Sequence, residues 1–464
     1  MGDSGGTSTF VNSGGTSTFV RSSRRLLRDS WCFLRNDWCL LCDSSRHIRS
    51  GQSCKVGLLT TDGFRDSIEI GREIRYDLYD LFLEAPPTLV PRHLRLEVPE
   101  RLDVQGEVLL PLDEAALVAA TRQLVEVEKV EALAIGFLHA WRDPRHERRA
   151  AEIIRGLYPD LAMTLSSAVA PEIREFERIS TACANAYVQP RMRRYLDKLE
   201  ASLAALGVTG ALYVMLSGGG IASVQEAKDY PIRLIESGPA AGAMAASWLA
   251  QRAGLDQVIS YDMGGTTAKM CLIQNGAPDR KFDFEAGRVR RFQKGSGLPL
   301  KVSVVDMIEI GAGGGSIARV DPASGLMKVG PRSAGAMPGP VCYDLGGTEP
   351  TVTDADVALG YISPETYFSG RMPLNRAKAV AAIEQKIARP LGVSVDEAAA
   401  MIRNIVEENM ASAIKREVHL RGYRPEDFAL FAFGGGGPTH VAGYRADVPV
   451  AVIFPQSPVF CALG

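Results

Sequence analysis

A chain of 464 residues is too long for one ordinary hydrophobic core, so two to four domains are expected. Its hydrophobic and charged fractions, 46% and 23%, are ordinary for a globular protein in water. The net charge of −2 gives no basic footprint for nucleic acid, and no apolar run reaches the roughly 18 residues of a transmembrane helix. We therefore expect neither nucleic acid nor a membrane among the partners.

The first 50 residues differ in composition from the remainder. The sequence SGGTSTFV occurs twice, at Ser4–Val11 and Ser13–Val20, and a basic stretch with interspersed aromatic residues follows. This stretch is not a signal peptide, because no small-residue cleavage site follows an apolar core. Residues 1–50 are therefore predicted to form an atypical, poorly ordered leader.

The cysteines do not form a disulfide framework. Of the eight, Cys32, Cys39, Cys42 and Cys54 lie near the N-terminus and the others are scattered. Cys39 and Cys42 have C-x-x-C spacing, but a zinc or redox site would need further ligands, and His47 is the only histidine nearby. Scattered cysteines are typical of reduced, buried residues, so a cytoplasmic location is predicted.

Alternating strands and helices are predicted from Cys54 onward. Strand-like segments are short apolar runs, and helix-like segments place apolar residues at helical spacing. Strands are expected at Cys54–Phe64, Val130–Ala140, Gly210–Gly220, Gln257–Met263 and at both ends of Phe428–Phe454. Helices are expected at Asp113–Val127, Pro144–Gly156, Ser180–Leu206, Glu236–Ala250, Arg376–Ile387 and Ser394–Arg421, with a β-rich region over Asp283–Gly360. Such alternation indicates an α/β fold.

Three predicted strands run directly into glycine loops. The segments are MLSGGG at Met215–Gly220, YDMGGTT at Tyr261–Thr267 and FAFGGGGPTH at Phe431–His440. Loops at strand ends build the ligand sites of α/β folds. Three such loops in one chain indicate a ligand site at the strand ends.

The stretch YDMGGTTAKM suggests which ligand this site binds. Asp262 stands at the end of a strand, and glycines and threonines form the turn that follows. Such a hairpin can present N–H groups to an anion, and its acid can hold hydrated Mg²⁺ beside a phosphate. An ordinary hairpin with a glycine turn is the alternative.

The chain resembles the hydantoinase A / 5-oxoprolinase family, which includes the ATP-dependent ketone carboxylase subunits. The stretches that carry the resemblance span about residues 55–464. They are Gly57–Leu81, Ser166–Pro190, Tyr230–Ala246, Tyr261–Ile273, Ile308–Asp321, Ser333–Gly360 and Phe431–His440. Lys269 stands where many family members have an acid, and the GGTTAK form with Lys294–Val302 looks more like the ketone-carboxylase branch.

The resemblance implies a fold, two cofactors and a domain division. The fold is an α/β architecture of the actin/Hsp70/sugar-kinase type, in which two lobes close on ATP and Mg²⁺. The second phosphate hairpin would consist of Asp262, which would also hold the metal, with Gly264, Gly265, Thr266 and Thr267. The loop beside the adenosine would consist of Gly434, Gly435, Gly436 and Gly437. Residues 51–180 would form the N-terminal region of the family, and residues 181–464 the hydantoinase A / oxoprolinase domain.

The N-terminus departs from the family pattern. Relatives begin with a first phosphate hairpin of the form D-x-G-G-T-F-T-D. The segment Gly2–Phe10 retains Asp3, Gly5, Gly6 and Thr7, but no second acid follows. The chain also stops at Cys461–Gly464, where relatives continue. We therefore expect either an incomplete first lobe or a first lobe in which one of the two N-terminal repeats still serves as the phosphate hairpin.

Four acids are candidate catalytic residues. Asp306 and Glu309 precede the glycine loop Gly311–Ser316 and could contact substrate or metal, or be solvated. Asp354 and Asp356 are spaced to share one face of an extended segment and could act as general base or metal ligands. Asp354 could instead cap a helix.

Three further features have a structural interpretation beside the functional one. The loop Gly311–Ser316 could be a phosphate or substrate turn, or a bend where subdomains pack. His440 is interpreted as a structural histidine at the end of a helix, and Cys342 as a packing residue rather than a nucleophile.

The resemblance implies an enzyme that uses ATP. The chain would be a subunit of a hydrolase or carboxylase that acts on a cyclic amide of the hydantoin or 5-oxoproline type, or on a small ketone. ATP would transfer a phosphoryl group to a carbonyl oxygen, with catalysis by positioning and charge neutralisation. The implied partner is a larger hydantoinase B-like subunit or a further copy of the chain. The alternative is a catalytically inactive structural or regulatory subunit, which the altered N-terminus favours.

Deletion of residues 1–50 tests the prediction for the leader. Because its composition is irregular and its repeats are polar, it adds no core, and the thermal transition should stay within a few degrees. Differential scanning fluorimetry of the full and shortened chains measures this. Loss of soluble expression would show that the leader completes a sheet.

Overall fold

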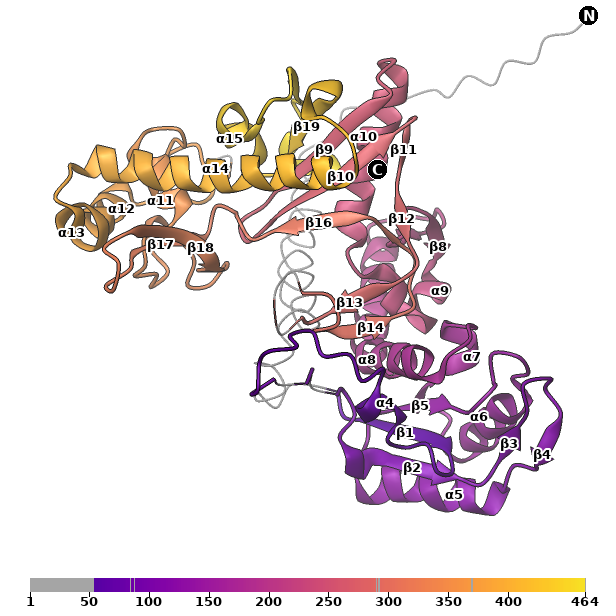
Figure 1. The fold of residues 1–464 in the computed structure, drawn as a ribbon. Coiled ribbons are helices and arrows are strands. Elements are labelled where there is room, and N and C mark those ends of the chain that lie inside the picture. Colours follow the sequence, from indigo (N-terminus) through magenta and orange to yellow (C-terminus); the bar gives the residue numbers. More distant parts are fainter. Residues whose placement is uncertain are drawn as a thin grey trace, which may run out of the picture. The chain divides into compact units, whose positions relative to one another are not determined.

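The computed structural model describes residues 54–83, 85–86, 88–288, 290, 293–368 and 370–463. The leader, the cysteines before Cys54 and the candidate first phosphate hairpin lie outside these residues. The described chain divides into two compact units (Figure 1). The first unit combines the described residues up to Val214 with Ile221–Ile235 and Asp283–Val302. The second unit combines Met215–Gly220, Glu236–Phe282 and the described residues from Ser303 onward.

The first unit is built on a parallel sheet. Its strand order is β2 (Arg95–Val98), β1 (Val56–Thr61), β5 (Ala132–Gly136) and β6 (Ala162–Leu165), with parallel pairing throughout. Strands β1 and β5 are buried along their whole length, as expected for a sheet covered on both faces. The long helix α8 (Glu175–Ala205) packs against β5 and β6, and α5 (Glu114–Arg122) and α6 (Arg145–Leu157) contact β2 and β6.

Shorter elements complete this unit. They are α4 (Ser67–Ile70), η1 (Arg92–Leu94), β3 (Arg101–Leu102), β4 (Val108–Leu110), η2 (Gln123–Val127), α7 (Ser166–Val169), β8 (Ile221–Ser223), α9 (Val224–Asp229), η3 (Pro231–Leu234), β13 (Phe284–Ala286) and β14 (Leu298–Leu300).

The second unit is built on a mixed sheet. Its path runs β11 (Ala277–Pro278), β10 (Ala268–Gln274), β9 (Gln257–Met263), β19 (Ala429–Phe433) and β20 (Val450–Ile453), and β16 (Met307–Ile310) also pairs with β10. Strands β9, β10 and β16 are antiparallel, whereas β9, β19 and β20 are parallel. The predicted strand Gln257–Met263 is therefore confirmed, as is the α/β class.

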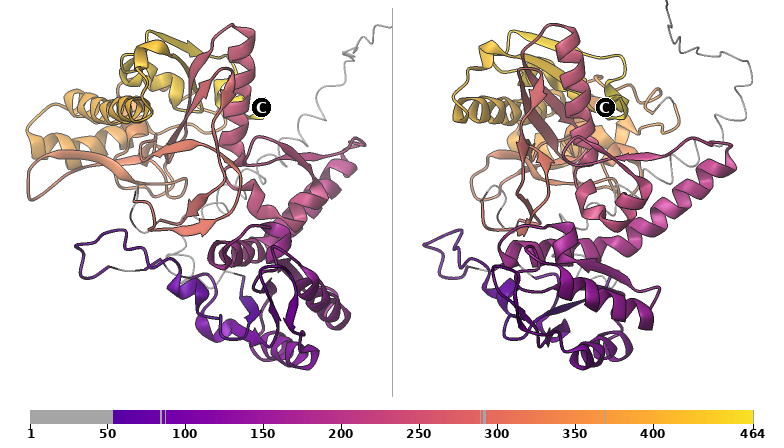
Figure 2. Two further views of the ribbon diagram at one scale, coloured as in Figure 1. Left: turned by 45° about the vertical axis from the view of Figure 1, so that its right-hand side comes forward. Right: turned by 90° about the vertical axis from the view of Figure 1, so that its right-hand side faces the viewer.

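Two hydrophobic clusters cover the two faces of this sheet. On one face, α10 (Ser237–Arg252) and η7 (Ser457–Ala462) pack against residues such as Val258, Ile273 and Phe433. The helices on the other face are α11 (Val352–Ala358), α14 (Val395–Leu420) and α15 (Gly437–Tyr444), drawn in orange to yellow in Figure 2. The hydrophobic cluster on this face includes Tyr261 and Met270. Alternate residues of each strand face opposite clusters, as the pleat of a strand requires.

The remaining elements of the second unit lie mainly between β16 and α14 in the sequence. They are β12 (Arg280–Lys281), β15 (Val304–Val305), β17 (Ser316–Val320), β18 (Met327–Ser333), η4 (Val341–Tyr343), α12 (Arg376–Ile383), η5 (Glu384–Ala388), α13 (Arg389–Leu391) and η6 (Pro425–Asp427). Within the described residues, no helix is long and apolar enough to cross a membrane.

One predicted strand is wrong in extent and in its partner. Gly210–Gly220 contains only the short strand β7 (Tyr213–Met215), which pairs with β8 and with neither main sheet. The apolar run that suggested a longer strand ends in a tight turn, in which Leu216 and Gly220 are hydrogen-bonded. The glycine loop Met215–Gly220 therefore does not follow a strand of the sheet that carries the other two loops.

Candidate functional site

Two of the predicted glycine loops meet at the C-terminal ends of neighbouring strands in the sheet of the second unit. Strands β9 and β19 are parallel, with Asp262 beside Phe433, so the loops that follow them begin at the same end of the two strands. The N–H of Gly436 donates to the carbonyl of Met263 at 2.9 Å, which joins the loops directly.

Gly434 is the point of closest approach between these loops. Its φ of +82° lies in the left-handed region that favours glycine. A Cβ at this position would overlap Oδ1 of Asp262 and the backbone of Met263. Glycine is thus required at 434 both by its own backbone angle and by the carboxyl of Asp262.

The loops leave several donors without acceptors. The N–H of Gly264 closes the hairpin by donating to the carbonyl of Thr267 at 3.1 Å. Within the described part of the chain, the N–H groups of Gly265, Thr266, Thr267 and Gly435 have no hydrogen-bond acceptor. Thr266 and Gly435 are exposed. Clustered backbone donors of this kind fit an anion such as a phosphate.

The carboxyl of Asp262 lies in a partly dehydrated position. Burial raises its pKa, while the thiol of Cys461, with Sγ 3.4 Å from Oδ2, and the charge of Lys269 act in the opposite direction. Lys269 is itself ion-paired with Glu236, which precedes α10. The negative charge of Asp262 is therefore poorly solvated, and a cation beside it would be stabilising.

A further glycine-rich segment, Gly311–Ser316, packs onto the hairpin. Gly314 and Gly315 donate from their N–H groups to the carbonyls of Gly264 and Gly265, at 3.2 and 2.6 Å. A Cβ at Gly313 would lie 2.8–2.9 Å from hairpin backbone atoms. This geometry favours the packing interpretation of the loop, because its glycines allow two backbones to touch.

Asp354 occupies a helix cap. Its carboxylate accepts hydrogen bonds from the N–H groups of Val341 and Cys342 at 3.1 and 2.7 Å, and from the N–H and hydroxyl of Thr351 at 2.9 and 2.8 Å. Thr351 in turn caps α11, which completes a capping box. With four donors on a fully buried side chain, the geometry matches the structural alternative. Burial and Asp354 raise the pKa of the nearby Cys342 thiol, in keeping with a packing residue.

The expectation that Asp354 and Asp356 share a face of an extended segment is wrong. Both residues lie in α11, where residues two positions apart point in different directions. Asp354 faces the loop that contains Cys342, whereas Asp356 faces α14 and α15.

Asp306 and Glu309 differ in their surroundings. Asp306 is ion-paired with Lys281 at 2.5 Å and with Arg421 at 3.2 Å. Glu309 lies on β16 opposite Lys269, which lies opposite Asp262 on β9. These three residues form a row on one face of the sheet, with Cα atoms of the outer two about 10 Å apart. Of the four predicted catalytic acids, Glu309 is the one that the sheet aligns with Asp262.

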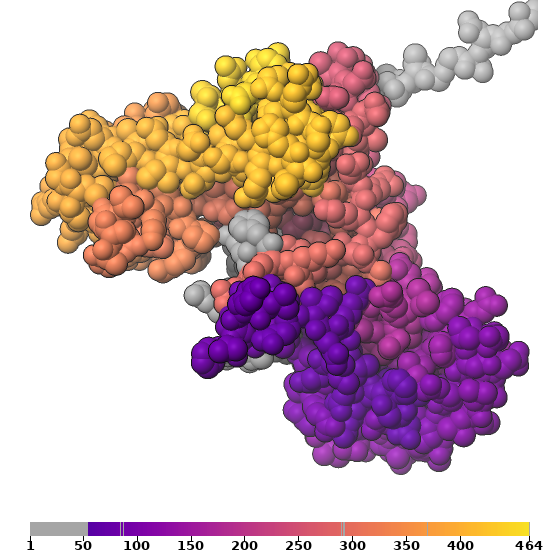
Figure 3. Space-filling model, in the orientation of Figure 1, coloured from indigo at the N-terminus to yellow at the C-terminus, as the bar shows by residue number. Residues whose placement is uncertain are grey.

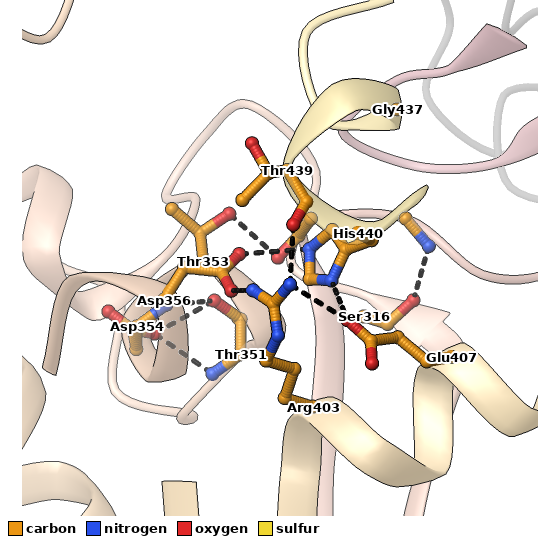
Figure 4. A network of polar contacts seen from close by, with 12 residues as sticks. Ser316, Thr351, Thr353, Asp354, Asp356, Arg403, Glu407, Gly437, Thr439 and His440 are labelled. Atoms are coloured by element: carbon orange, nitrogen blue, oxygen red, sulfur yellow. Dashed lines mark hydrogen bonds and ion pairs between the residues drawn. The ribbon is translucent and has the colours of Figure 1, made fainter. Parts of the chain in front are cut away.

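A buried charged network lies beneath α15. Its members are Asp356, Arg403, Glu407 and His440, and we call them the quartet (Figure 4). His440 has Nε2 3.0 Å from Asp356 Oδ2 and Nδ1 3.0 Å from Glu407 Oε1. Arg403 lies 2.7 Å from Asp356 and 2.9 Å from Glu407, and also donates to the carbonyl of Thr439.

Most of this network is not evident from the sequence. The sequence predicts a structural His440 and pairs Asp356 with the wrong neighbour, and it does not single out Arg403 or Glu407. It also does not single out Glu236 and Cys461, which lie near Lys269 and Asp262. One signal was available: Arg403 and Glu407 are four residues apart on α14, among apolar residues that face the core.

Among the described residues, no cluster of three or more His, Cys, Asp or Glu side chains could hold a metal ion. Asp262 is the acid that the hairpin places beside the open N–H donors, so it could hold a metal only if water or a bound phosphate supplied the other ligands. That arrangement suits Mg²⁺, which usually keeps several waters.

Comparison with known proteins identifies the family. The model described as "Hydantoinase/oxoprolinase" matches residues 178–464, and that of the "Hydantoinase/oxoprolinase N-terminal region" matches residues 46–158. The chain belongs to the hydantoinase/oxoprolinase family.

Relatives of this hydantoinase/oxoprolinase family member include subunits of larger enzymes. The acetophenone carboxylase gamma subunit of Aromatoleum aromaticum is 45% identical over 89% of this chain and 57% of its own length. The caprolactamase subunit alpha of Pseudomonas jessenii is 41% identical over 88% of this chain and 58% of its own length.

Two solved structures are also similar. The nucleotide-free structure of acetone carboxylase, from a study of ATP-dependent acetone carboxylation, has a TM-score of 0.76 at 29% identity, covering 90% of this chain and 59% of its own. The ATP-dependent caprolactamase from Pseudomonas jessenii has a TM-score of 0.72 at 39% identity, covering 90% and 60%. The chain thus spans less than two thirds of the length of these four relatives.

Substitution of Asp354 separates a cap from a catalytic acid. Asp354→Asn places an NH₂ group where N–H donors converge, so the free energy of unfolding should fall by about 3 kcal/mol, the upper end for hydrogen bonds to a charged group. Urea denaturation measures this. Asp396→Asn, at an exposed first-turn acid of α14, is the matched control and should change stability by less than about 1 kcal/mol. Unchanged stability with lost turnover would favour a catalytic Asp354.

Proposed function

We propose that this chain forms the ATP-binding part of an ATP-dependent hydrolase or carboxylase. The observation that carries the proposal is the joining of the Asp262 hairpin to the loop Gly434–Gly437, with backbone donors left open on both. The ATP dependence printed for the solved acetone carboxylase and caprolactamase agrees with it. An acid–glycine hairpin at a sheet edge is also what a two-lobed actin/Hsp70-like ATPase requires, so we propose that architecture.

Each element of the site has a role in this proposal. ATP would supply a phosphoryl group for transfer to a carbonyl oxygen of the substrate. The open N–H groups of Gly265, Thr266 and Thr267 would donate to phosphate oxygens, and the Asp262 carboxylate would hold hydrated Mg²⁺. The N–H of Gly435 extends the donor set from the second loop. These groups are fixed before a ligand arrives, so they stabilise developing charge without reorganising.

The relatives support a proposal for the substrate class. We propose a cyclic amide of the hydantoin, oxoproline or lactam type, or a small ketone, in which a carbonyl oxygen accepts the phosphoryl group. Among the predicted catalytic acids, Glu309 is the one aligned with Asp262 across Lys269. We assign it to the substrate side of the site.

Removing the charge of Asp262 tests the phosphate and metal assignment. Asp262→Asn keeps the shape, and Mg·ATP binding should weaken by about 1.5–3 kcal/mol, which is roughly 10- to 150-fold in affinity. Isothermal titration calorimetry measures the change. The ligand-free protein should melt at the same temperature or higher, because the buried carboxylate with its raised pKa is costly to keep ionised at neutral pH.

The matched control is Asp256→Asn, which removes the same charge at an exposed position just before β9. It should leave Mg·ATP affinity unchanged. Equal affinities of Asp262→Asn and wild type would overturn the assignment. A wild type that binds no Mg·ATP would support the inactive-subunit alternative.

We also propose that turnover needs a second subunit. The named relatives include a gamma and an alpha subunit of larger enzymes, and a hydantoinase B-like partner or a further copy of this chain would complete the assembly. Affinity purification from the native host, followed by mass spectrometry, should recover a co-purifying partner. Substrate turnover by the isolated, monomeric chain would contradict this prediction.

A further inference from the structure

The quartet is a set of four charged or titratable side chains removed from water. His440, Asp356, Arg403 and Glu407 are 1%, 2%, 7% and 8% exposed. They come from three helices: Asp356 from α11, Arg403 and Glu407 from α14, and His440 from α15. The outer sides of α14 and α15 form part of the surface on the side shown in Figure 3, in orange to yellow. Buried charges of this kind must balance one another.

The geometry defines the protonation state of His440. Each ring nitrogen lies 3.0 Å from a carboxylate oxygen, and an ionised carboxylate only accepts hydrogen bonds. A neutral imidazole has one N–H and could satisfy one of the two contacts. Only the imidazolium donates to both. Arg403 lies 2.7 Å from Asp356 and 2.9 Å from Glu407, so each carboxylate of the quartet contacts both Arg403 and His440.

The direction of the pKa shift of His440 agrees with a protonated imidazole. Burial lowers the pKa of His440, but the hydrogen bonds to Asp356 and Glu407 outweigh it, and the net pKa is raised despite the nearby Arg403. The charged groups that face His440 from the packed helices are those three residues. The ring of Tyr361 lies against the Arg403 guanidinium, with its centroid 3.8 Å from the guanidinium carbon.

The quartet is linked to the glycine loop through α15. This helix has eight residues and begins at Gly437, the last glycine of the loop. Arg403 donates to the carbonyl of Thr439, and Gly443 is pressed so closely on Glu407 that a Cβ would overlap its carboxylate. The hydroxyl of Tyr444 donates to the carbonyl of Gly437 at 3.0 Å.

We propose that His440 is a positioning residue, a permanent imidazolium at neutral pH whose quartet clamps α15 and the loop Gly434–Gly437, and that loss of its proton in alkaline solution releases both. Deprotonation would remove one hydrogen bond and leave one buried negative charge uncompensated. This inference rests on the proposed nucleotide site. Because release of α15 also releases the loop Gly434–Gly437, Mg·ATP affinity falls as the pH rises through the pKa of His440. The stability that His440 contributes is complete at pH values below its unfolded pKa of about 6.5. It is lost as the pH rises through the raised pKa of the folded state.

Two measurements test the clamp without any nucleotide. In protein labelled with ¹⁵N-histidine, a signal with imidazolium shifts should be present at about pH 7.5 and absent from the spectrum of His440→Gln. Hydrogen exchange of the peptide that covers α15 should rise above its intrinsic pH dependence as this signal titrates. A neutral imidazole at pH 7.5, or exchange that follows only the intrinsic rate, would overturn the proposal.

Calorimetry then connects the clamp to binding. Mg·ATP affinity of wild type should exceed that of His440→Gln by about 10-fold at pH 7.5, equivalent to about 1.4 kcal/mol. The difference should vanish at alkaline pH, where both proteins lack the imidazolium. The control His419→Gln removes an exposed histidine of α14 and should match wild type at every pH. A constant ratio across the pH range would overturn the link to the loop.

A second variant keeps the test decisive if His440→Gln does not fold. Glu407→Gln removes one of the two carboxylates, so the ¹⁵N signal of His440 should titrate at lower pH than in wild type. An unchanged titration would contradict the quartet. A wild type that binds no Mg·ATP at any pH would contradict the proposed function, while the label and exchange measurements would still decide the clamp.

Discussion

The candidate site depends on the contact between the backbone of Gly434 and the carboxyl of Asp262. Any side chain at position 434 would occupy the space of that carboxyl. The contact brings the hairpin after β9 and the loop after β19 within hydrogen-bonding reach, and it holds the acid away from water. Both the orientation of the open donors and the cost of the Asp262 charge follow from it.

The quartet is a second constraint, and it lies on the face of the same sheet that α11, α14 and α15 cover. The quartet contributes little hydrophobic burial, and desolvating four charges is expensive, so it is poor as a general source of stability. Its value lies in specificity: the ion pairs and hydrogen bonds are satisfied together in one arrangement of three helices. The short helix α15 takes its position from that arrangement, and the glycine loop takes its position from α15.

Local patterns in the sequence were sufficient to predict the local structure. The strand Gln257–Met263, the hairpin after it and the helix predicted at Glu236–Ala250 all depend on neighbouring residues, and each is present in the structure. The partners of buried charges were not, because they are contacts between residues far apart in the chain. Asp356 resembles any acid near a helix start until α14 and α15 are packed against it. Likewise, Gly210–Gly220 has strand-like composition, and only its tertiary environment shows that it remains outside the main sheet.

The pairing of β9 with β19 has a consequence for how the site is assembled. Its two loops are neighbours in space, but most of the second unit separates them in sequence. Contacts of such long range form late, since the chain entropy of closing the intervening segment must be overcome first. During synthesis, the Asp262 hairpin leaves the ribosome long before the strand that carries Gly434. Ligand binding by a nascent chain would therefore mark the moment at which this unit has closed, not the earlier formation of its hairpin.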